Sequence, residues 1–327
     1  MVKGFKYHHS HFTYYQYFRN GTWEPGFLSE DLNINISSLS SSIQYGQQIF
    51  EGLKAYRRKD GGVQLFRPDA NARRFSDSAK RLMMPAVSES VFIDAVKQVV
   101  EANLDLVPDY ETKGSLYIRP FMIGVGHNLG VKPSEDYLFG IAVSPVGAYY
   151  ENGFQPISVV TSPYDRVAPN GLGAYKAGAN YAGGLYPKYL AKQQGYDECL
   201  YLDAQSHRYL DEASATNIVA IKGSTYITPQ SPSILPSITN HSLQRIAKEI
   251  LNLEVISKKV ELSELSNFDE FGFCGTAAVI TPVKLVVNEN ERYVFNEFKT
   301  LEKIYEVLTQ IQYGDITPFP EWIIRIS

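Results

Sequence analysis

The sequence predicts a protein of two domains that each combine helices and strands, in an α+β or α/β fold. Its 327 residues exceed the size at which a single hydrophobic core stops growing, about 250–300 residues. Turn-punctuated strands fill much of the first half, and strands alternate with helical patterns in the second half. Because Gly, Pro and Asn punctuate the middle of the chain, we place a small N-terminal domain at 1–147, a connection at 148–155 and a larger C-terminal domain at 156–327.

The strands of the first half are predicted by turns and by runs of aromatic and β-branched residues. Asn20-Gly21 and Asp60-Gly-Gly62 accept the positive φ of tight turns and mark two hairpins. A Gly/Pro loop is expected at 125–134, between two longer strands. Strands are expected at 12–18, 22–25, 53–57, 63–67, 115–124 and 137–144, and later at 199–202, 217–221, 225–228 and after 275.

Helices are predicted by capping residues and by apolar residues at helical spacing. Asp69 is a suitable N-cap after Pro68, and Ser88 is another. Phe92, Ala95 and Val99 recur on one face and should be buried. Gly195 ends the helix that follows 180. Helices are expected at 69–82, from 88 past 102, at 180–194, from Ser237 or Thr239 to 251, at 264–271 and at 301–313.

Composition argues against several classes of partner. The net charge is −4 and no basic block occurs, so neither a nucleic acid nor an anionic membrane is expected to bind. No apolar run approaches the roughly 18–20 residues of a membrane span, and no signal peptide is expected at the N-terminus. Only two cysteines, Cys199 and Cys274, occur, which favours a cytoplasmic location. No metal site is expected, since zinc-ligand spacing is missing.

One segment, Gly171 to Tyr181, carries a lysine among small residues. An amine such as that of Lys176 attacks carbonyl groups only when its ammonium form is disfavoured. Small neighbours allow a flat ligand to approach the backbone, and Tyr181 could supply a hydroxyl group. Taken alone, this composition favours a flexible loop with a solvated lysine, so other segments must decide.

Three further features could bind an anion. Ser237 to Thr239 opens a helix, where free N–H groups and the positive end of the dipole form a phosphate seat. The Gly275-Thr-Ala277 turn offers N–H and hydroxyl donors, and Arg74 offers positive charge.

An acidic pair, Asp211-Glu212, is expected in a loop between strands. It suits a protonated pyridine nitrogen if buried, although a solvated surface turn is the commoner role of such a pair.

Together these motifs resemble the branched-chain amino-acid aminotransferases, pyridoxal-phosphate enzymes of fold type IV. The resemblance runs from Tyr45 to the Ile311–Gly314 segment, most of the chain, and implies a C-terminal domain with a β-barrel-like core. The motifs that carry it are Tyr45–Gly52, 65–74 with 78–82, Ser115–Pro120, Pro145–Tyr149, the Lys176 and Glu212 segments, Ile234-Leu-Pro and Gly275-Thr-Ala277.

The resemblance implies a role for each matched residue. Lys176 would form the internal aldimine with pyridoxal phosphate and shuttle the substrate proton. Glu212 would keep the pyridine nitrogen protonated, and Tyr181 would bond the ring hydroxyl. The phosphate would be held by Arg74, Ile238, Thr239 and Thr276. The substrate carboxylate would meet Tyr117, Arg119 and the Thr276–Ala277 turn, and the apolar pocket would be walled by Tyr45, Phe50 and Tyr149.

The implied activity is transamination between leucine, isoleucine or valine and 2-oxoglutarate, in a cytoplasmic homodimer. Leu129 and Val131 would close the pocket from the partner subunit. A pocket for these side chains should discriminate weakly, since one methylene changes binding by about 1–3 kcal/mol. Arg119 or Tyr117 would meet the distal carboxylate of 2-oxoglutarate. Within the same fold, a D-amino-acid aminotransferase or an aminodeoxychorismate lyase is the alternative; outside it, a non-catalytic cofactor carrier.

The chain departs from the family's usual pattern at a few positions. Ser237 stands where many members have glycine, and Asn240 where many have arginine. The Cys-x-x-Cys that follows the Gly275 turn in mammalian members is missing, so their redox switch should be absent. None of these changes removes a group that the reaction requires.

Overall fold

The structure is a computed structural model that describes residues 6–147 and 154–326. The chain folds into two compact units: unit 1 is Met1–Glu151, Tyr175–Ala179 and Ile311–Ser327, and unit 2 is Asn152–Ala174 and Asn180–Gln310. The expected domain limits stay a prediction, because most of the 148–155 connection lies outside the described residues. The structure adds that the lysine segment and the C-terminus both pair with strands of unit 1.

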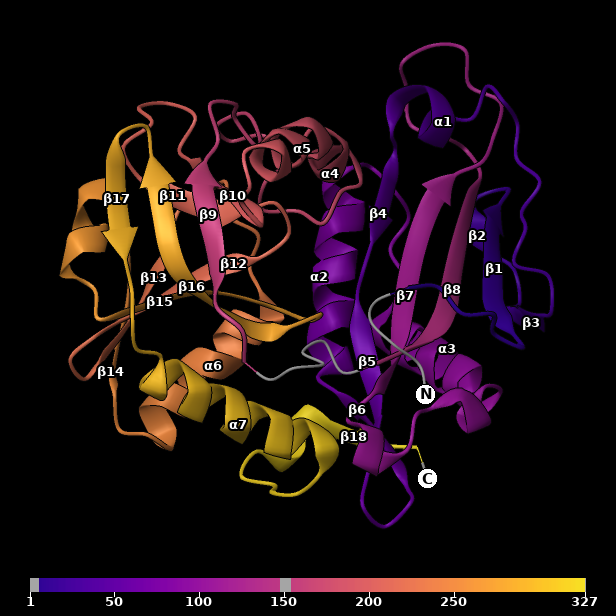
Figure 1. Cartoon of the computed structure of the whole chain (residues 1–327). Coiled ribbons are helices and arrows are strands. Elements are labelled where there is room, and N and C mark those ends of the chain that lie inside the picture. The colour runs from indigo at the N-terminus through magenta and orange to yellow at the C-terminus, as the bar shows by residue number, and fades with distance from the viewer. Residues whose placement is uncertain (1–5, 148–153, 327) are drawn as a thin grey trace. The chain divides into compact units, whose positions relative to one another are not determined.

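Unit 1 is built on one antiparallel sheet. Among the described residues nine strands take part, in the order β18-β6-β5-β7-β8-β1-β2, with β3 beside β1 and β4 beside β7 (Figure 1). The strands are β1 (Thr13–Arg19), β2 (Thr22–Trp23), β3 (Phe27–Ser29), β4 (Gln48–Phe50), β5 (Leu53–Arg57), β6 (Val63–Phe66), β7 (Ser115–Gly124), β8 (Tyr137–Val146) and β18 (Ile323–Arg325). Both predicted hairpins are confirmed, and β7 has the expected limits.

The helices of unit 1 pack on this sheet around a cluster of aromatic rings. The centroids of Phe75 and Phe92 lie 5.4 Å apart, and those of Phe75 and Phe139 lie 5.5 Å apart. The helices are α1 (Ser41–Tyr45), α2 (Pro68–Arg81) and α3 (Glu89–Glu101), with short 3-10 turns at Leu104–Leu106, Tyr110–Thr112 and Pro320–Trp322.

The caps of α2 and α3 test the sequence expectations directly. Ser88 caps α3 as predicted, its hydroxyl accepting from the N–H of Val91. The predicted N-cap of α2, Asp69, is wrong, because α2 starts at Pro68 and its N-cap is Arg67 in the left-handed conformation. The N–H of Arg67 is bonded to the carbonyl of Trp322, so a tertiary contact decides where α2 begins.

Unit 2 contains a curled mixed sheet. Among the described residues its order is β11-β10-β9-β16-β15-β12-β13-β14, with β17 beside β16 (Figure 1). Past β14 the chain returns to β11, where the N–H of Leu210 bonds the carbonyl of Val260 at 2.8 Å. This contact brings the two ends of the sheet together, which agrees with the expected barrel-like core. The strands are β9 (Ile157–Thr161), β10 (Glu198–Leu202), β11 (Leu210–Ala213), β12 (Asn217–Lys222), β13 (Thr225–Pro229), β14 (Glu254–Lys258), β15 (Glu270–Gly275), β16 (Val279–Asn288) and β17 (Glu291–Val294).

Two helix expectations in this part of the chain need correction. The single helix expected at 180–194 is divided at Gly183-Gly184 into two pieces, because paired glycines interrupt a helix. The helix expected at 264–271 is a 3-10 turn at Leu262–Asn267, and Phe271 already lies in β15, where it is buried. The helices are α4 (Ala179–Ala182), α5 (Leu185–Gln193), α6 (Ile238–Glu249) and α7 (Lys299–Tyr313).

The structure also bears on the expectations for the two cysteines and for membrane-spanning helices. Cys199 and Cys274 are both buried and both free thiols. Along 6–147 and 154–326, no helix is both long enough and apolar enough to cross a membrane.

Candidate active site

Lys176 is fixed in unit 1 by backbone pairing with β4. The N–H of Phe50 donates to the carbonyl of Lys176 at 3.1 Å, and the N–H of Gly178 donates to Gln48 at the same distance. On the other side, the N–H of Lys176 donates to the Ser78 hydroxyl of α2 at 3.0 Å. A segment held from both sides is not the flexible loop that its composition alone favours.

The amine of Lys176 lies in a partly buried, charged environment. Its Nζ is 4.6 Å from the centroid of the Phe50 ring. Burial alone would raise the pKa of Glu51, but Arg74 and then Lys176 outweigh it, so the pKa of Glu51 is lowered. Lys176, Arg74 and Glu51 therefore form one electrostatic group within unit 1.

Glu51 is a residue of this group that the sequence did not identify. It is fully buried, and its two carboxylate oxygens accept from Nε and Nη2 of Arg74 at 2.7 and 2.8 Å. Asn71 donates to the same carboxylate at 2.7 Å. A glutamate between Phe50 and Gly52 in an apolar strand segment was the available signal, since a buried carboxylate needs a cationic partner. Glu51 thus fixes the orientation of Arg74.

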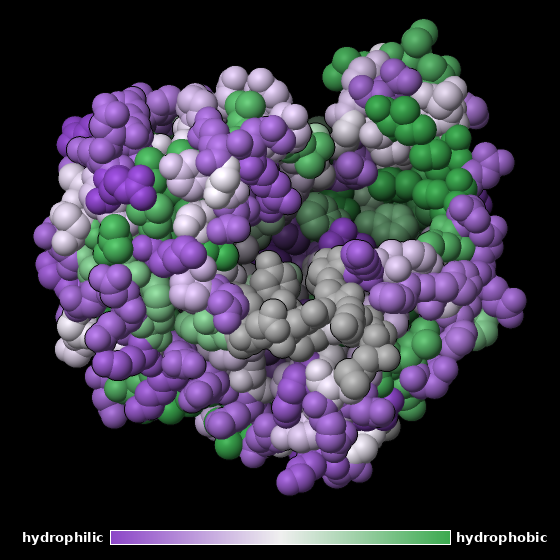
Figure 2. Space-filling model, in the orientation of Figure 1, coloured by the Kyte–Doolittle hydropathy of each residue, from purple (hydrophilic) through white to green (hydrophobic). Residues whose placement is uncertain are grey.

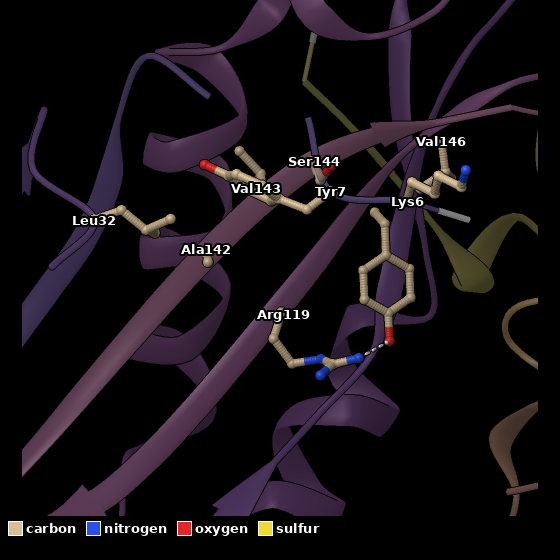
Figure 3. Close-up of a pocket in the computed structure, with 9 residues that line it drawn as sticks. Lys6, Tyr7, Leu32, Arg119, Ala142, Val143, Ser144 and Val146 are labelled. Atoms are coloured by element: carbon tan, nitrogen blue, oxygen red, sulfur yellow. Dashed lines mark hydrogen bonds between the residues drawn. The ribbon is translucent and has the colours of Figure 1, made fainter. Parts of the chain in front are cut away.

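Tyr117 and Arg119 lie side by side on β7. Nη2 of Arg119 donates to the Tyr117 hydroxyl at 2.8 Å, and the guanidinium carbon is 4.9 Å from the centroid of the Phe50 ring. Both line a hollow of about 270 Å³, mostly apolar, to which Leu32, Ala142 and Val143 contribute (Figure 3). Nε of Arg119 is buried without a hydrogen bond among the described residues, as expected of a cation prepared for an anionic ligand.

The remaining predicted pocket residues of this part lie near α1. The Tyr45 hydroxyl donates to the carbonyl of Leu129 at 2.5 Å. Leu129 and Val131 are 80% and 85% exposed, and Figure 2 shows hydrophobic side chains gathered on the surface around α1. Tyr149, the third predicted wall residue, lies outside the described residues.

In unit 2, Glu212 is buried and surrounded by hydrogen-bond donors. Its Oε1 is 2.7 Å from Nη2 of Arg166 and accepts from the N–H of Leu235 at 3.2 Å. Its Oε2 accepts from the side-chain amide of Asn217 at 2.9 Å. Two neutral donors and a cation favour an ionised carboxylate. The sequence expectation of a loop is wrong, since Glu212 lies within β11, all four residues of which are buried.

Arg166 and Asn217 are the second and third residues that sequence reasoning missed. Arg166 also donates to the carbonyl of Ser233, and its side chain is 7% exposed. Arg166 lies ten residues before Lys176 in a Pro-rich turn, outside any predicted helix or strand, so no hydrophobic periodicity indicated that it would be buried. Asn217 was assigned only to a strand.

The expected phosphate-binding site, at the N-terminus of α6, lies beside Glu212 in the same unit. The bond from Leu235 to Glu212 fixes the segment that leads directly into α6, where Ser237 is the N-cap and accepts from the N–H of Asn240. Ile238 and Thr239 supply the first N–H groups of this twelve-residue helix. The register of β12 against β15 pairs Asn217 with Cys274, so the turn that contains Thr276 and Ala277 follows directly. An ionised carboxylate and an anion seat this close fit a ligand with a ring cation and a phosphate.

Tyr181, on α4, is partly buried and belongs to unit 2. The structure therefore brings Lys176, Arg74, Phe50, Tyr117 and Arg119 together on unit 1. It brings Glu212, Ile238, Thr239, Thr276 and Ala277 together on unit 2. A single site formed from both groups stays a prediction.

Comparison with known proteins defines the class. Residues 48–286 match the family described as amino-transferase class IV, and this range contains Lys176, Glu212 and every phosphate residue named above. The chain therefore belongs to the class IV aminotransferases.

Within that class, several relatives are branched-chain-amino-acid aminotransferases. The branched-chain-amino-acid aminotransferase of Haemophilus influenzae is 43% identical, over 99% of this chain and 97% of that protein. The branched-chain-amino-acid aminotransferase of Helicobacter pylori is also 43% identical, over 99% of this chain and 96% of that protein. Among solved structures, the branched-chain amino acid aminotransferase from Escherichia coli is 27% identical. It has a TM-score of 0.79 and covers 97% of this chain and 99% of that one.

Proposed function

We propose that this protein transfers the amino group between L-leucine, L-isoleucine or L-valine and 2-oxoglutarate, with pyridoxal phosphate as cofactor. The observation that carries the proposal is the environment of Glu212, an ionised carboxylate beside the N-terminus of α6. Such a pair suits a ligand with a protonated ring nitrogen and a phosphate. The names of the relatives support the substrate class.

Pyridoxal phosphate, when bound, supplies an electron sink that weakens the Cα–H bond of the amino acid. Glu212 would hold the ring nitrogen protonated, and Tyr181 would donate to the ring oxygen. Arg74, oriented by Glu51, would bind the phosphate with the N–H groups of α6 and with Thr276. The Nζ atom of Lys176 would take the proton from the substrate Cα and return it.

Substrate recognition follows from the unit 1 surface. Arg119, supported by the Tyr117 hydroxyl, would bind a carboxylate, since its Nε is buried and still has a hydrogen to donate. Phe50, with Tyr45 and Tyr149, would exclude water from an apolar side chain. A pocket of rings separates leucine from valine weakly, because one methylene is worth only about 1–3 kcal/mol. Arg119 or Tyr117 would meet the distal carboxylate of 2-oxoglutarate in the same pocket.

A homodimer is part of the proposal. Leu129 and Val131 are apolar and almost fully exposed, and a second copy of the chain would cover them. Sedimentation of Leu129→Asp should reveal a weaker dimer, whereas Val294→Asp, at an exposed valine of β17, should leave it intact. A dimer equally stable in both variants would contradict this assignment.

The two free buried thiols agree with a reducing, cytoplasmic compartment.

The spectrum of the purified protein tests the function. We expect a yellow protein whose visible band is lost on adding L-leucine and returns with 2-oxoglutarate. A change with D-alanine alone, or pyruvate formation from aminodeoxychorismate, would assign the protein to the alternatives within the fold. Colour without a response to any amino acid would indicate a cofactor carrier.

A further inference from the structure

Asn240, on α6, lies at the centre of a buried polar network in unit 2. It is 4% exposed. Its Oδ1 accepts from the Tyr226 hydroxyl at 2.7 Å and from the Gln244 amide at 3.2 Å. Its Nδ2 donates to Oγ1 of Thr228 at 2.8 Å and to Oδ1 of Asn217 at 3.4 Å. All four polar positions of one amide are thus engaged away from solvent.

The orientation of the Asn240 amide is imposed from both ends. Burial, and then the neighbouring Cys274, raise the pKa of Tyr226 well above its ordinary value, so its hydroxyl stays protonated and donates. The Thr228 hydroxyl gives its own proton to the carbonyl of Ile218 at 2.8 Å, so its oxygen must accept. The amide oxygen of Asn240 therefore faces Tyr226, and its NH₂ group faces Thr228 and Asn217.

This orientation determines that of Asn217. Since Asn240 offers a donor, Asn217 turns its own oxygen toward it. The NH₂ group of Asn217 is then left to donate to Oε2 of Glu212 at 2.9 Å and to the carbonyl of Leu235 at 3.2 Å. A reversed Asn217 amide would place its oxygen against the carboxylate, which repels it.

We propose that Asn240 is a positioning residue for Glu212, acting through Asn217, with Tyr226 fixing the direction of the relay. The inference rests on the proposed function, in which Glu212 holds a ring nitrogen protonated. It assigns a purpose to Asn240, a position where this chain departs from the usual arginine of the family it resembles. Asn240 itself would touch neither cofactor nor substrate.

The test is Asn240→Asp, which keeps the shape of the side chain but removes its donor. Without that donor, the oxygen of the Asn217 amide is no longer held toward residue 240. The Asn217 amide then reverses, and its oxygen faces Glu212. In holoenzyme carrying ring-¹⁵N pyridoxal phosphate, we expect the ¹⁵N resonance to move toward the unprotonated position. We also expect kcat to fall about tenfold with KM for L-leucine unchanged.

Tyr226→Phe is the second variant, and Asn103→Asp is the matched control. The phenylalanine removes only the hydroxyl, so it should shift the resonance in the same direction, by less. Asn103 is a fully buried asparagine of unit 1, whose Oδ1 accepts from the N–H groups of His11 and Phe12 and whose Nδ2 donates to two carbonyls. Its variant should lower the melting temperature and leave the ¹⁵N resonance in place.

These outcomes distinguish a failure of the proposed relay from a failure of the proposed function. If Asn240→Asp and Tyr226→Phe lower only the melting temperature, as the control does, the relay is overturned and the proposed function stands. If the unmodified protein binds pyridoxal phosphate but shows no protonated ring nitrogen, the role of Glu212 fails first, and the relay with it.

Discussion

Replacement of Glu51 by glutamine tests the electrostatic group around Lys176. The substitution keeps the shape of the side chain and removes its charge. It leaves Arg74, whose side chain is only 12% exposed, without the carboxylate that holds two of its nitrogens at 2.7 and 2.8 Å. The new amide NH₂ group would also face the donors of Arg74, so one hydrogen bond becomes a repulsion.

The magnitude follows from burial. Removing one partner of a buried ion pair costs about 3–5 kcal/mol, because the remaining charge is uncompensated. Since Arg74 retains some exposure, we expect a loss near the lower limit, about 3 kcal/mol in the free energy of unfolding. The folded-state pKa of Glu51 is lowered, so its contribution is present at neutral pH and is lost as the pH falls below the ordinary range of about 4.

Urea unfolding of the cofactor-free protein at pH 7 and below pH ~4 measures both effects. Arg73→Gln is the control, because Arg73 lies on the same helix but is 55% exposed and pairs with Asp69 and Glu89, whose side chains are 30% and 46% exposed. Its loss should stay below about 1 kcal/mol. The difference between the two variants should shrink in acid. Equal losses in Glu51→Gln and in the control at pH 7 would refute the reasoning.

Two further predictions concern buried charges elsewhere. The carboxylate of Glu270 accepts hydrogen bonds from two backbone N–H groups at the start of α7, both at 2.8 Å, and so caps this helix. Glu270→Ala should therefore lower the free energy of unfolding by about 1–3 kcal/mol, measured by thermal or urea unfolding. An unchanged unfolding midpoint would show that this cap does not stabilise the protein. Burial lowers the pKa of Lys54 to about 8, so the folded state binds fewer protons than the unfolded state above pH 8. Stability should therefore rise from pH 8 to 10, and this rise should disappear in Lys54→Met; a rise that persists in the variant would assign it to another group.

Local signals predicted the elements that depend on local chemistry. The Asn20-Gly21 turn, the Ser88 cap and the strand at 115–124 were predicted from short-range features, and each is confirmed. The start of α2 could not be predicted, because it depends on a bond to Trp322, about 250 residues further along the chain. Likewise β4 is three residues long and exists through its pairing with β7 and with the lysine segment.

The candidate site shows the same division. Small neighbours and an acidic pair drew attention to Lys176 and Glu212, and the resemblance to a family then assigned their roles. Glu51, Arg166 and Asn217 were missed because each matters only through a partner that is distant in sequence. Glu212 was taken for a loop residue because two acids rarely occupy a buried strand, and its donors come from three other segments.

The most direct test of the central claim is to reduce the purified protein with borohydride and to map its peptides by mass spectrometry. The account predicts a phosphopyridoxyl group on Lys176, with no other lysine modified. A group on a different lysine, for which the buried Lys54 with its lowered pKa is the obvious competitor, would contradict it, and so would a protein that carries no modified lysine at all.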